Sequence, residues 1–324
     1  MTTDETELSP NRDDWSWATL LTYHNGSRFI ESALSSVSIA LQQLIDRTSP
    51  DHHIELLVVD DCSTESEAAK LMDVTSRLVL PGSCHTTVVR FAVNRGVSAA
   101  RYEGLRRTTR SFVHIMDQDD EVRPDFYASV LVDYTKTKSA SAQEILWIVG
   151  CEYIDAEGVV TRAHRLQSDG ITTRHLNDVG RWLSVGNPVV SPGMVVLSPS
   201  LRDEAEQYFK PLNRSVDGSD DYLMFIYLLK RGAHFVVADE LGFRYRKHEF
   251  NQSIGHSFRA STQQGLVAMR EQGILSEREC SIVTARGRLQ SRLKRHPRSR
   301  LMRLLVYLSS PLVGWRLLQA KLTS

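Results

Sequence analysis

The sequence predicts an α/β fold built on a mostly parallel sheet, and three observations support this prediction. Short apolar runs alternate with segments of helical periodicity from Trp17 to Gly150, which is typical of βαβ units. Hydrophobic residues make up 41% and charged residues 24% of the 324 residues, as in a globular protein with a sizeable core. Polar clusters follow four of the apolar runs, where parallel sheets bind their ligands.

The strands and helices of the first half follow from local patterns. The strand candidates are Ala18–Thr22, Ile54–Asp60, Thr87–Phe91, Phe112–Met116 and Ile145–Val149. A crossover helix is expected from Phe29 to Ile45, because its apolar residues recur at three- and four-residue steps. A second helix begins at Thr64, with Glu67 closing a capping box, and another begins at Pro124.

The second half has a weaker pattern. It contains an expected hairpin around Asp155–Gly158, short strands at Met194–Leu197, Phe235–Ala238 and Gly242–Arg246, and a helix from Ser219 to Arg231. Ser219 would cap that helix and Gly232 would end it. The weakly patterned region from Cys151 to Leu212 is expected to select the substrate, with Trp182, Asn187 and the loop Pro188–Gly193 as candidates.

The strongest polar cluster is Asp117–Asp120, which directly follows an apolar run. Its three carboxylates would repel one another unless a cation lay among them, and hard oxygen ligands select Mg²⁺ or Mn²⁺. Such an ion binds phosphate oxygens and neutralises the charge on a leaving diphosphate. Alternatively, Asp119 and Asp120 cap the helix that begins at Pro124. The other clusters are Thr22–Gly26, Asp60–Thr64 and Asn94–Gly96.

Charge is distributed unevenly along the chain. The formal net charge is zero, which argues against a nucleic-acid-binding surface, but ten Lys and Arg residues and no acidic residue follow Glu279. The apolar stretch Leu301–Leu318 is interrupted by Arg303 and Arg316, so it is too broken to span a membrane. We expect it to lie in the plane of an anionic membrane surface. The alternative is packing on the catalytic domain or in a homo-oligomer interface.

The cysteines and the N-terminus bear on localisation. Cys62, Cys84, Cys151 and Cys280 are scattered, which suggests neither a zinc site nor a disulfide framework. The first fourteen residues lack the apolar core of a signal peptide. These features predict a cytoplasmic protein, with peripheral attachment at the inner face of the plasma membrane through the basic tail.

Together, the motifs resemble the inverting glycosyltransferases of family two, over roughly residues 17–255. The matching segments, in order, are Leu20–Gly26, Val58–Thr64, Asn94–Arg101, Met116–Asp120 (the DxD motif), Gly218–Tyr222, Tyr245–His248 and Asn251–Ser253. The resemblance implies a GT-A fold, with a Rossmann-like sheet flanked by helices. It divides the chain into a flexible tail (1–16), a catalytic domain (17–257) and a helical basic C-terminal extension (258–324). Residues 17–122 would bind the nucleotide sugar and residues 123–257 the acceptor.

The resemblance also implies an activity. The enzyme would transfer a sugar from a UDP- or dTDP-linked donor to an acceptor hydroxyl, with inversion and with Mn²⁺ or Mg²⁺. The acceptor would be a glycan or a lipid-linked molecule in the synthesis of bacterial surface polysaccharide or glycolipid. Asp221, with Asp220, would be the catalytic base. In the family a Glu-Asp pair often stands here.

The remaining site residues are carried over in the same way. Asp61 would form a hydrogen bond with the nucleobase of the donor. Asp117 would contact the ribose or the metal, and Asp119 would be the principal metal ligand. The full donor-binding set is Thr22, His24, Asn25, Asp60, Asp61, Asn94, Arg101, Asp117, Gln118 and Arg246. The metal set is Asp119, Asp117, Asp120 and His248. His24 stands where the family often has an aromatic residue, so either its imidazole or Tyr23 would stack on the base.

Other functions fit less well. A nicotinamide dehydrogenase or a nucleotidyltransferase needs a glycine-rich turn after the first strand, and Thr22–Ser27 lacks that spacing. A catalytically silent nucleotide-sugar-binding scaffold of the same fold is the remaining rival. The presence of Asp61, Asp119 and Asp221 argues against it.

Overall fold

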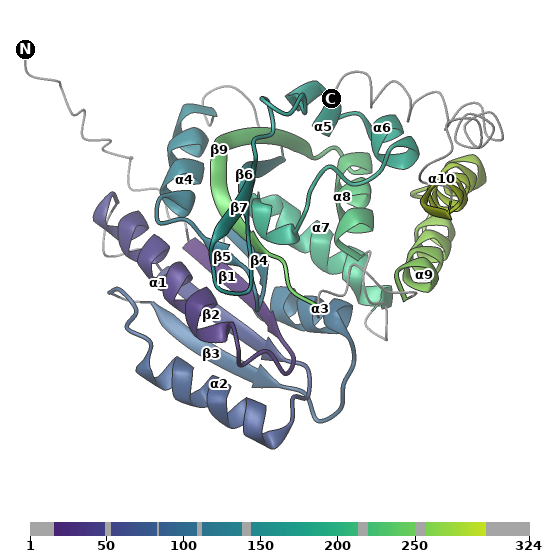
Figure 1. Cartoon of the computed structure of the whole chain (residues 1–324). Coiled ribbons are helices and arrows are strands. Elements are labelled where there is room, and N and C mark those ends of the chain that lie inside the picture. Colours follow the sequence, from purple (N-terminus) through teal and green to yellow (C-terminus); the bar gives the residue numbers. More distant parts are fainter. Residues whose placement is uncertain are drawn as a thin grey trace, which may run out of the picture.

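A computed structural model describes residues 16–48, 53–82, 84–108, 112–137, 144–212, 220–249 and 257–295. Within these ranges one curled sheet is flanked by helices, and the predicted α/β class is confirmed (Figure 1). Several sequence predictions lie outside the described residues: the N-terminal tail, the cap at Ser219, the motif Asn251–Ser253 and the membrane segment Leu301–Leu318.

The first half of the sheet is parallel. It consists of β1 (Ser16–Tyr23), β2 (His53–Asp60), β3 (His85–Arg90) and β4 (Phe112–Asp117), in the order β3-β2-β1-β4. The register places Thr22 of β1 beside Asp117 of β4, and Tyr23 beside Asp60 of β2. The three motifs that follow these strands therefore meet at one edge of the sheet. The strands predicted here are confirmed to within two residues at each end.

Four helices cover this half: α1 (Ile30–Asp46), α2 (Glu65–Arg77), α3 (Val97–Arg107) and α4 (Phe126–Thr137). Thr64 caps α2 by accepting from the backbone N–H of Glu67, but the predicted capping box is wrong. The Glu67 carboxylate instead accepts from the backbone N–H of Ser27, at 3.0 Å, and from its hydroxyl, at 2.9 Å. These donors tie α2 to the loop after β1. The helix α4 begins two residues after Pro124.

The second half of the sheet is mixed, so the prediction of parallel pairing holds for the first four strands better than for the rest. Its strands are β5 (Glu121–Val122), β6 (Ile145–Ile154), β7 (Val160–His164), β8 (Val195–Leu197) and β9 (His234–Arg246). β8 runs antiparallel to both β4 and β6, while β6 and β9 are parallel. β9 replaces the two strands predicted there, with register shifts beside Val149. The predicted hairpin joins β6 to β7.

The remaining helices gather on one side of the sheet (Figure 1). They are α5 (Thr173–Leu176), α6 (Val179–Ser184), α7 (Pro199–Phe209), α8 (Asp220–Lys230), α9 (Ser257–Glu271) and α10 (Glu277–Arg295), with 3₁₀ turns at Pro192–Met194 and Lys210–Leu212. α8 ends at Lys230, and the predicted terminator Gly232 lies two residues beyond it with a φ of +100°. α9 packs on α8, and α10 packs on α6 and α9. Among the described helices none is both long and apolar enough to cross a membrane.

A chain of buried polar groups fixes the 3₁₀ turn beside the sheet. The Thr19 hydroxyl bonds the Tyr127 hydroxyl, which bonds Nδ1 of His114, and Nε2 of His114 bonds the carbonyl of Gly193 at 2.8 Å. Burial lowers the pKa of His114 to about 4, so the imidazole is neutral and Nε2–H donates to the carbonyl. This holds the turn, and Ser191 before it, at the end of β4.

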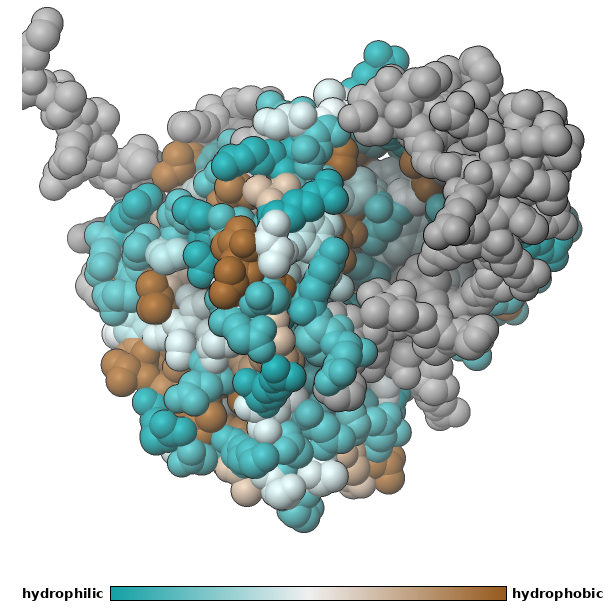
Figure 2. All heavy atoms as spheres, in the orientation of Figure 1, coloured by the Kyte–Doolittle hydropathy of each residue, from teal (hydrophilic) through white to brown (hydrophobic). Residues whose placement is uncertain are grey.

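The surface offers no broad apolar area on the face shown in Figure 2, where hydrophobic residues form small separate patches among hydrophilic ones. The large apolar side chains that are most exposed in the described residues are Ile39, Met72, Val79, Val93, Val159 and Val160. Scattered residues of this kind are ordinary on a globular protein.

Two helical glycines offer a matched test of the packing. A Cβ at Gly104 of α3 would lie 2.1 Å from Leu20 Cδ1 of β1, whereas a Cβ at Gly287 of α10 would meet nothing within 4 Å. We expect Gly104→Ala to lower the free energy of unfolding by roughly 1–3 kcal/mol. Gly287→Ala should raise it by about 0.5–1 kcal/mol, because Ala restricts the unfolded chain. Urea denaturation of both variants measures this, and equal effects would contradict the α3–β1 packing.

Candidate active site

A cleft with a volume of about 520 Å³ lies at the carboxyl ends of β1, β2 and β4. Of the residues predicted for the site, all except Asp60 and Arg246 line it. The lining also includes Arg28, Phe29, Val190, Ser191, Pro192 and Tyr245. The fold therefore gathers segments from both halves of the chain around one space.

Asp61 is positioned by the loop that leads into α3. Its two carboxylate oxygens accept from the backbone N–H groups of Arg95, at 2.6 Å, and Gly96, at 2.7 Å. Asp60 is different, because it is buried outside the cleft lining. It accepts from the backbone N–H of Ser63 and lies 3.2 Å from Nε of Arg90. Asp60 therefore shapes the loop that carries Asp61, and its predicted donor contact lacks support.

His24 presents an exposed ring at the cleft. Its Nδ1 lies 2.8 Å from the carbonyl of Asp61 and its Nε2 lies 3.0 Å from Nδ2 of Asn25. A carbonyl only accepts, so Nδ1 carries the proton and Nε2 accepts from the amide. Tyr23 is buried, and its hydroxyl donates to the carbonyl of Glu67. Of the two rings considered for stacking, His24 is the exposed one.

Gln118, the variable residue of the DxD motif, clamps the loop after β1. Its Oε1 accepts from the backbone N–H of His24 at 2.6 Å, and its Nε2 donates to the carbonyl of His24 at 3.1 Å. The amide passes so close to Gly26 that a Cβ there would lie 2.2 Å from Gln118 Cδ. Gly26 is therefore required by this close approach rather than by its backbone angles.

Arg101 joins the two halves of the site. It is 4% exposed, its Nη2 donates to Oδ1 of Asp117 at 2.9 Å, and its Nη1 bonds Oδ2 of Asp220. The Thr22 hydroxyl also donates to Asp117, at 3.1 Å. Burial raises the pKa of Asp220, and the Arg101 charge opposes that change. The guanidinium thus links the end of β4 to the start of α8.

Asp119 and His248 both line the cleft and are in direct contact, with Oδ2 of Asp119 and Nε2 of His248 2.7 Å apart. The imidazole is packed against the ring of Phe29, with centroids 4.7 Å apart. Burial and the neighbouring charge of Asp117 raise the pKa of Asp119. Searching the described ranges reveals no group of three or more His, Cys, Asp or Glu side chains arranged to hold a metal ion. The pair of Asp119 and His248 offers one carboxylate and one imidazole, which are two of the ligands that a metal site needs.

Asp120 supports the site rather than pointing free carboxylate oxygens into it. It is 1% exposed, and its oxygens accept from the backbone N–H of Arg246 and the hydroxyl of Ser191, both at 2.9 Å. Burial, reinforced by Asp119, raises its pKa well above the usual range. Both oxygens thus have protein donors, and the role of Asp120 as a metal ligand stays a prediction. Neither Asp119 nor Asp120 caps α4, because both are bonded elsewhere.

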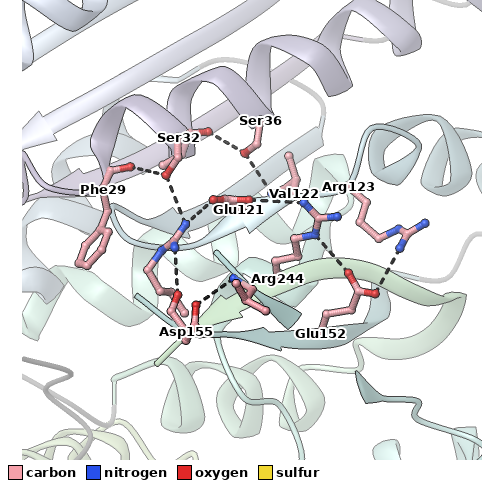
Figure 3. Close-up of polar contacts among 12 residues, drawn as sticks. Phe29, Ser32, Ser36, Glu121, Val122, Arg123, Glu152, Asp155 and Arg244 are labelled. Atoms are coloured by element: carbon pink, nitrogen blue, oxygen red, sulfur yellow. Dashed lines mark hydrogen bonds and ion pairs between the residues drawn. The ribbon is translucent and has the colours of Figure 1, made fainter. Parts of the chain in front are cut away.

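Arg246 is also occupied inside the protein. It is 2% exposed, and its guanidinium donates to the carbonyls of Asp119, at 2.8 Å, and Asp155, at 3.1 Å. It also bonds Ser32 and pairs with Glu121. Figure 3 shows the surrounding network, in which Arg244 and Arg123 reach Glu152. Each guanidinium nitrogen thus has a protein partner, and the contact of Arg246 with a diphosphate stays a prediction.

Asp221 lies in the first turn of α8, next to the bridged Asp220. Its Oδ2 accepts from Nδ2 of Asn187 at 3.4 Å. Burial and then the charge of Asp220 raise the pKa of Asp221 to about 7. Sequence reasoning marked Asn187 only as an acceptor candidate and did not single out Ser191. The loop composition drew attention to this segment, but its partners are visible only in the fold.

Known proteins place this geometry in context. A sequence model of the family described as "Glycosyl transferase family 2" matches residues 21–165. Curated proteins gave no significant match in sequence. Among solved structures, S. aureus TarS 1-349 in complex with UDP-GlcNAc superposes with a TM-score of 0.54 at 14% identity, covering 84% of this chain and 71% of that one.

Two further TarS structures give the same result. S. aureus TarS superposes with a TM-score of 0.51 at 14% identity, and the match covers 43% of that chain. TarS 1-349 gives a TM-score of 0.51 at 13% identity, covering 71% of that chain. Similarity at this level of identity shows a shared fold. Residues 21–165 therefore match glycosyl transferase family 2, and the described α/β architecture is consistent with the GT-A fold.

Proposed function

We propose that this glycosyltransferase moves a sugar from a UDP- or dTDP-linked donor to an acceptor hydroxyl with inversion at the anomeric carbon. One observation carries the proposal: a single cleft is lined by Asp61, Asp119 and Asp221, which suit base recognition, diphosphate binding and proton transfer. The crystallisation of the similarly folded TarS 1-349 with UDP-GlcNAc supports a nucleotide-sugar donor.

The nucleotide would bind beside β1 and β2. Each carboxylate oxygen of Asp61 already accepts one backbone N–H and keeps a further lone pair, which suits the N3–H of uracil or thymine. The exposed His24 ring, held by Asp61 and Asn25, is placed to stack on the base. Residues 17–122 would thus form the donor half, and 123–257 the acceptor half.

Asp119 and His248 are the residues that would hold Mn²⁺ or Mg²⁺. They fit because one carboxylate oxygen and one imidazole nitrogen already converge at 2.7 Å, and because Asp119 is crowded by Asp117. Two protein ligands leave positions for phosphate oxygens and water, as is usual for Mg²⁺. The bound ion would neutralise the charge of the departing diphosphate. Asp117, held by Arg101 and Thr22, would contact the ribose or the ion.

Asp221 would act as the base. Its carboxylate accepts the proton of the acceptor hydroxyl while that oxygen forms a bond to the anomeric carbon and the bond from that carbon to the diphosphate breaks. A pKa of about 7 is close to the ideal for this role, because the ionised form is abundant and still basic. Asp220 is committed to Arg101, so Asp221 is the carboxylate of the pair that can reach the acceptor.

Replacing Asp119 tests the metal assignment. Asp119→Asn should weaken Mn²⁺-dependent binding of UDP by roughly 100-fold, because it removes a charged ligand. Asp73→Asn on the exposed face of α2 is the control and should bind normally. Calorimetric titration of UDP with and without EDTA measures the effect. Undiminished UDP binding in EDTA would rule out the metal role.

The pH dependence of turnover tests the base. Because Asp221 must be ionised to accept a proton, kcat should rise tenfold per pH unit on the acid side and level off above about pH 7. Asp221→Asn should remove this limb, lower kcat by roughly 10²–10⁴-fold and spare UDP binding. Transfer rates measured from pH 5 to 9 decide the matter.

The neighbouring residue provides the comparison for that experiment. Asp220→Asn should chiefly reduce stability, because it leaves the buried Arg101 cation with one carboxylate fewer. An Asp220→Asn enzyme that stays folded but loses the acid limb would transfer the base role to Asp220. Wild-type protein that binds UDP and turns over no donor would favour a catalytically silent scaffold.

We also propose that residues 296–324 attach the enzyme to the inner face of the plasma membrane, near a lipid-linked acceptor of surface polysaccharide or glycolipid synthesis. This segment contains no acidic residue, five Lys and Arg residues, and Trp315 among many leucines. Each nearby Lys or Arg gains about 1 kcal/mol at an anionic surface. Oligomer formation through the same segment is the alternative.

Vesicle co-sedimentation tests the membrane proposal. Full-length protein should bind anionic vesicles at low salt, and a chain ending at Arg295 should not. The cut belongs there because α10 ends at Arg295, packs on α6 and contains the buried Arg286. Equal binding by both proteins would reject the membrane role, whereas a change in molecular mass without lipid would indicate oligomers.

A further inference from the structure

Arg286 of α10 is a buried cation that connects the C-terminal helices to the proposed base. It is 6% exposed, and its Nη1 donates to the carbonyl of Trp182, at 2.8 Å, and to the hydroxyl of Tyr222, at 2.7 Å. Its Cζ lies 4.8 Å from the centroid of the Tyr222 ring. Its partners in the described part of the chain are carbonyls and a phenol, not carboxylates. Ion pairing therefore does not explain the burial of this cation.

The first connection runs through α8. Tyr222 directly follows Asp221, and its hydroxyl donates to the carbonyl of Trp182 at 2.8 Å while accepting from Arg286. Burial raises the pKa of Tyr222, so the hydroxyl stays protonated and keeps donating. The three groups close a triangle that fixes the first turn of α8 against α6. The direction in which Asp221 points depends on that turn.

The second connection runs through the loop after α6. A Cβ at Gly186, where φ is +129°, would lie 3.6 Å from Nη1 of Arg286, so the backbone packs on the guanidinium. One helical turn further along α10, Gln290 donates to the carbonyl of Val185 at 3.5 Å. Gly186 is followed in this loop by Asn187, whose side-chain amide donates to Asp221. α10 thus holds both the base and its amide donor.

We propose that α10 is part of the acceptor side of the active site and that Arg286 is a positioning residue, which sets Asn187 against Asp221. The inference rests on the proposed role of Asp221 as the base. Arg286 does not touch the reacting atoms and acts through Tyr222 and the Val185–Asn187 loop. The C-terminal helices therefore help to orient the base and are more than a membrane attachment.

The charged groups that lie near Asp221 come from elements other than those that connect it to Arg286, apart from its neighbour Asp220 on α8. The groups whose charges reach Asp221 are Asp220 on the same helix, Arg101 of α3, Asp117 after β4 and Tyr208 of α7. None of these four lies on α6 or α10. A change at Arg286 therefore reaches Asp221 through its two connections.

The ionisation of Asp221 in the full chain tests the proposal without any substrate. The Asp221 carboxyl carbon is followed by NMR in protein labelled at aspartate, and Asp221→Asn identifies its signal. Arg286→Gln should raise the titration midpoint by roughly 0.5–1 pH unit, because the amide of Asn187 favours the ionised carboxylate. Asn187→Ala should give the same shift. The double variant should shift no further, because the two residues act in series.

Controls separate positioning from general damage. Arg288→Gln, on the exposed face of α10, should leave the titration unchanged, and Arg286→Lys should fall between wild type and Arg286→Gln. If Arg286→Gln does not fold, Arg286→Lys and Tyr222→Phe test the same link and should shift the midpoint in the same direction. An unchanged midpoint in folded variants, or shifts that add in the double variant, would overturn the proposal.

Binding of UDP with Mn²⁺ separates this inference from the proposed function. Arg286→Gln should bind UDP as the wild type does, because its contacts lie on the acceptor side. Wild-type protein that binds no UDP would overturn the proposed function. The Asp221 titration would still test whether Arg286 positions Asn187 against Asp221. Loss of UDP binding in folded Arg286→Gln would show a wider role and overturn the positioning assignment.

Discussion

The site depends on one buried cation placed between two carboxylates. Arg101 binds Asp117 at the end of β4 and Asp220 at the start of α8, residues that lie far apart in the sequence. A guanidinium in this environment needs both partners, since an unpaired buried charge costs roughly 3–5 kcal/mol. The bridge therefore joins the proposed nucleotide side of the cleft to the proposed acceptor side, and it holds the start of α8, with Asp221, at a fixed place relative to Asp117.

The same logic assigns different tasks to similar side chains. Asp61 is bonded by backbone N–H groups, Asp119 faces an imidazole, and Asp220 faces a guanidinium. Asp221 accepts a long bond from the neutral amide of Asn187 and a backbone hydrogen bond from Tyr222, and no cation is bonded to it among the described residues; burial and the charge of Asp220 raise its pKa to about 7. A carboxylate with weak support for its charge is the one best suited to take up a proton. Environment rather than residue type thus distinguishes the proposed base from its neighbours.

Much of this architecture could be predicted from the sequence, because apolar runs and the polar residues after them have a fixed relation in a parallel sheet. The strands β1 to β4 and the shared edge follow from that relation. The tasks of Asp120 and Arg246 do not. Both stand in motifs, but β9 pairs with β5 and β6 in a register that buries Arg246 under the cleft. Neither spacing nor composition states which face of a distant strand a side chain occupies. The predicted capping box at Glu67 is wrong for a similar reason, because its carboxylate accepts from Ser27 in a loop that is distant in the sequence.

The C-terminal extension shows the same limit and leads to a further step. In the sequence, Arg286 and Arg288 are two members of one basic run, yet the first is buried against Tyr222 and the second is exposed. Helical periodicity separates them by about 200°, so one faces α6 and α8 and the other faces solvent. The basic run therefore contains buried side chains, which pack inside the protein, as well as exposed ones. α10 packs on α6 and α9 and contains the buried Arg286. An electrostatic attraction to a surface is available only to side chains that remain solvated. If residues 296–324 bind a membrane and Asp221 is the base, as proposed, an acceptor presented there would meet a base whose orientation depends on the helix that precedes this segment.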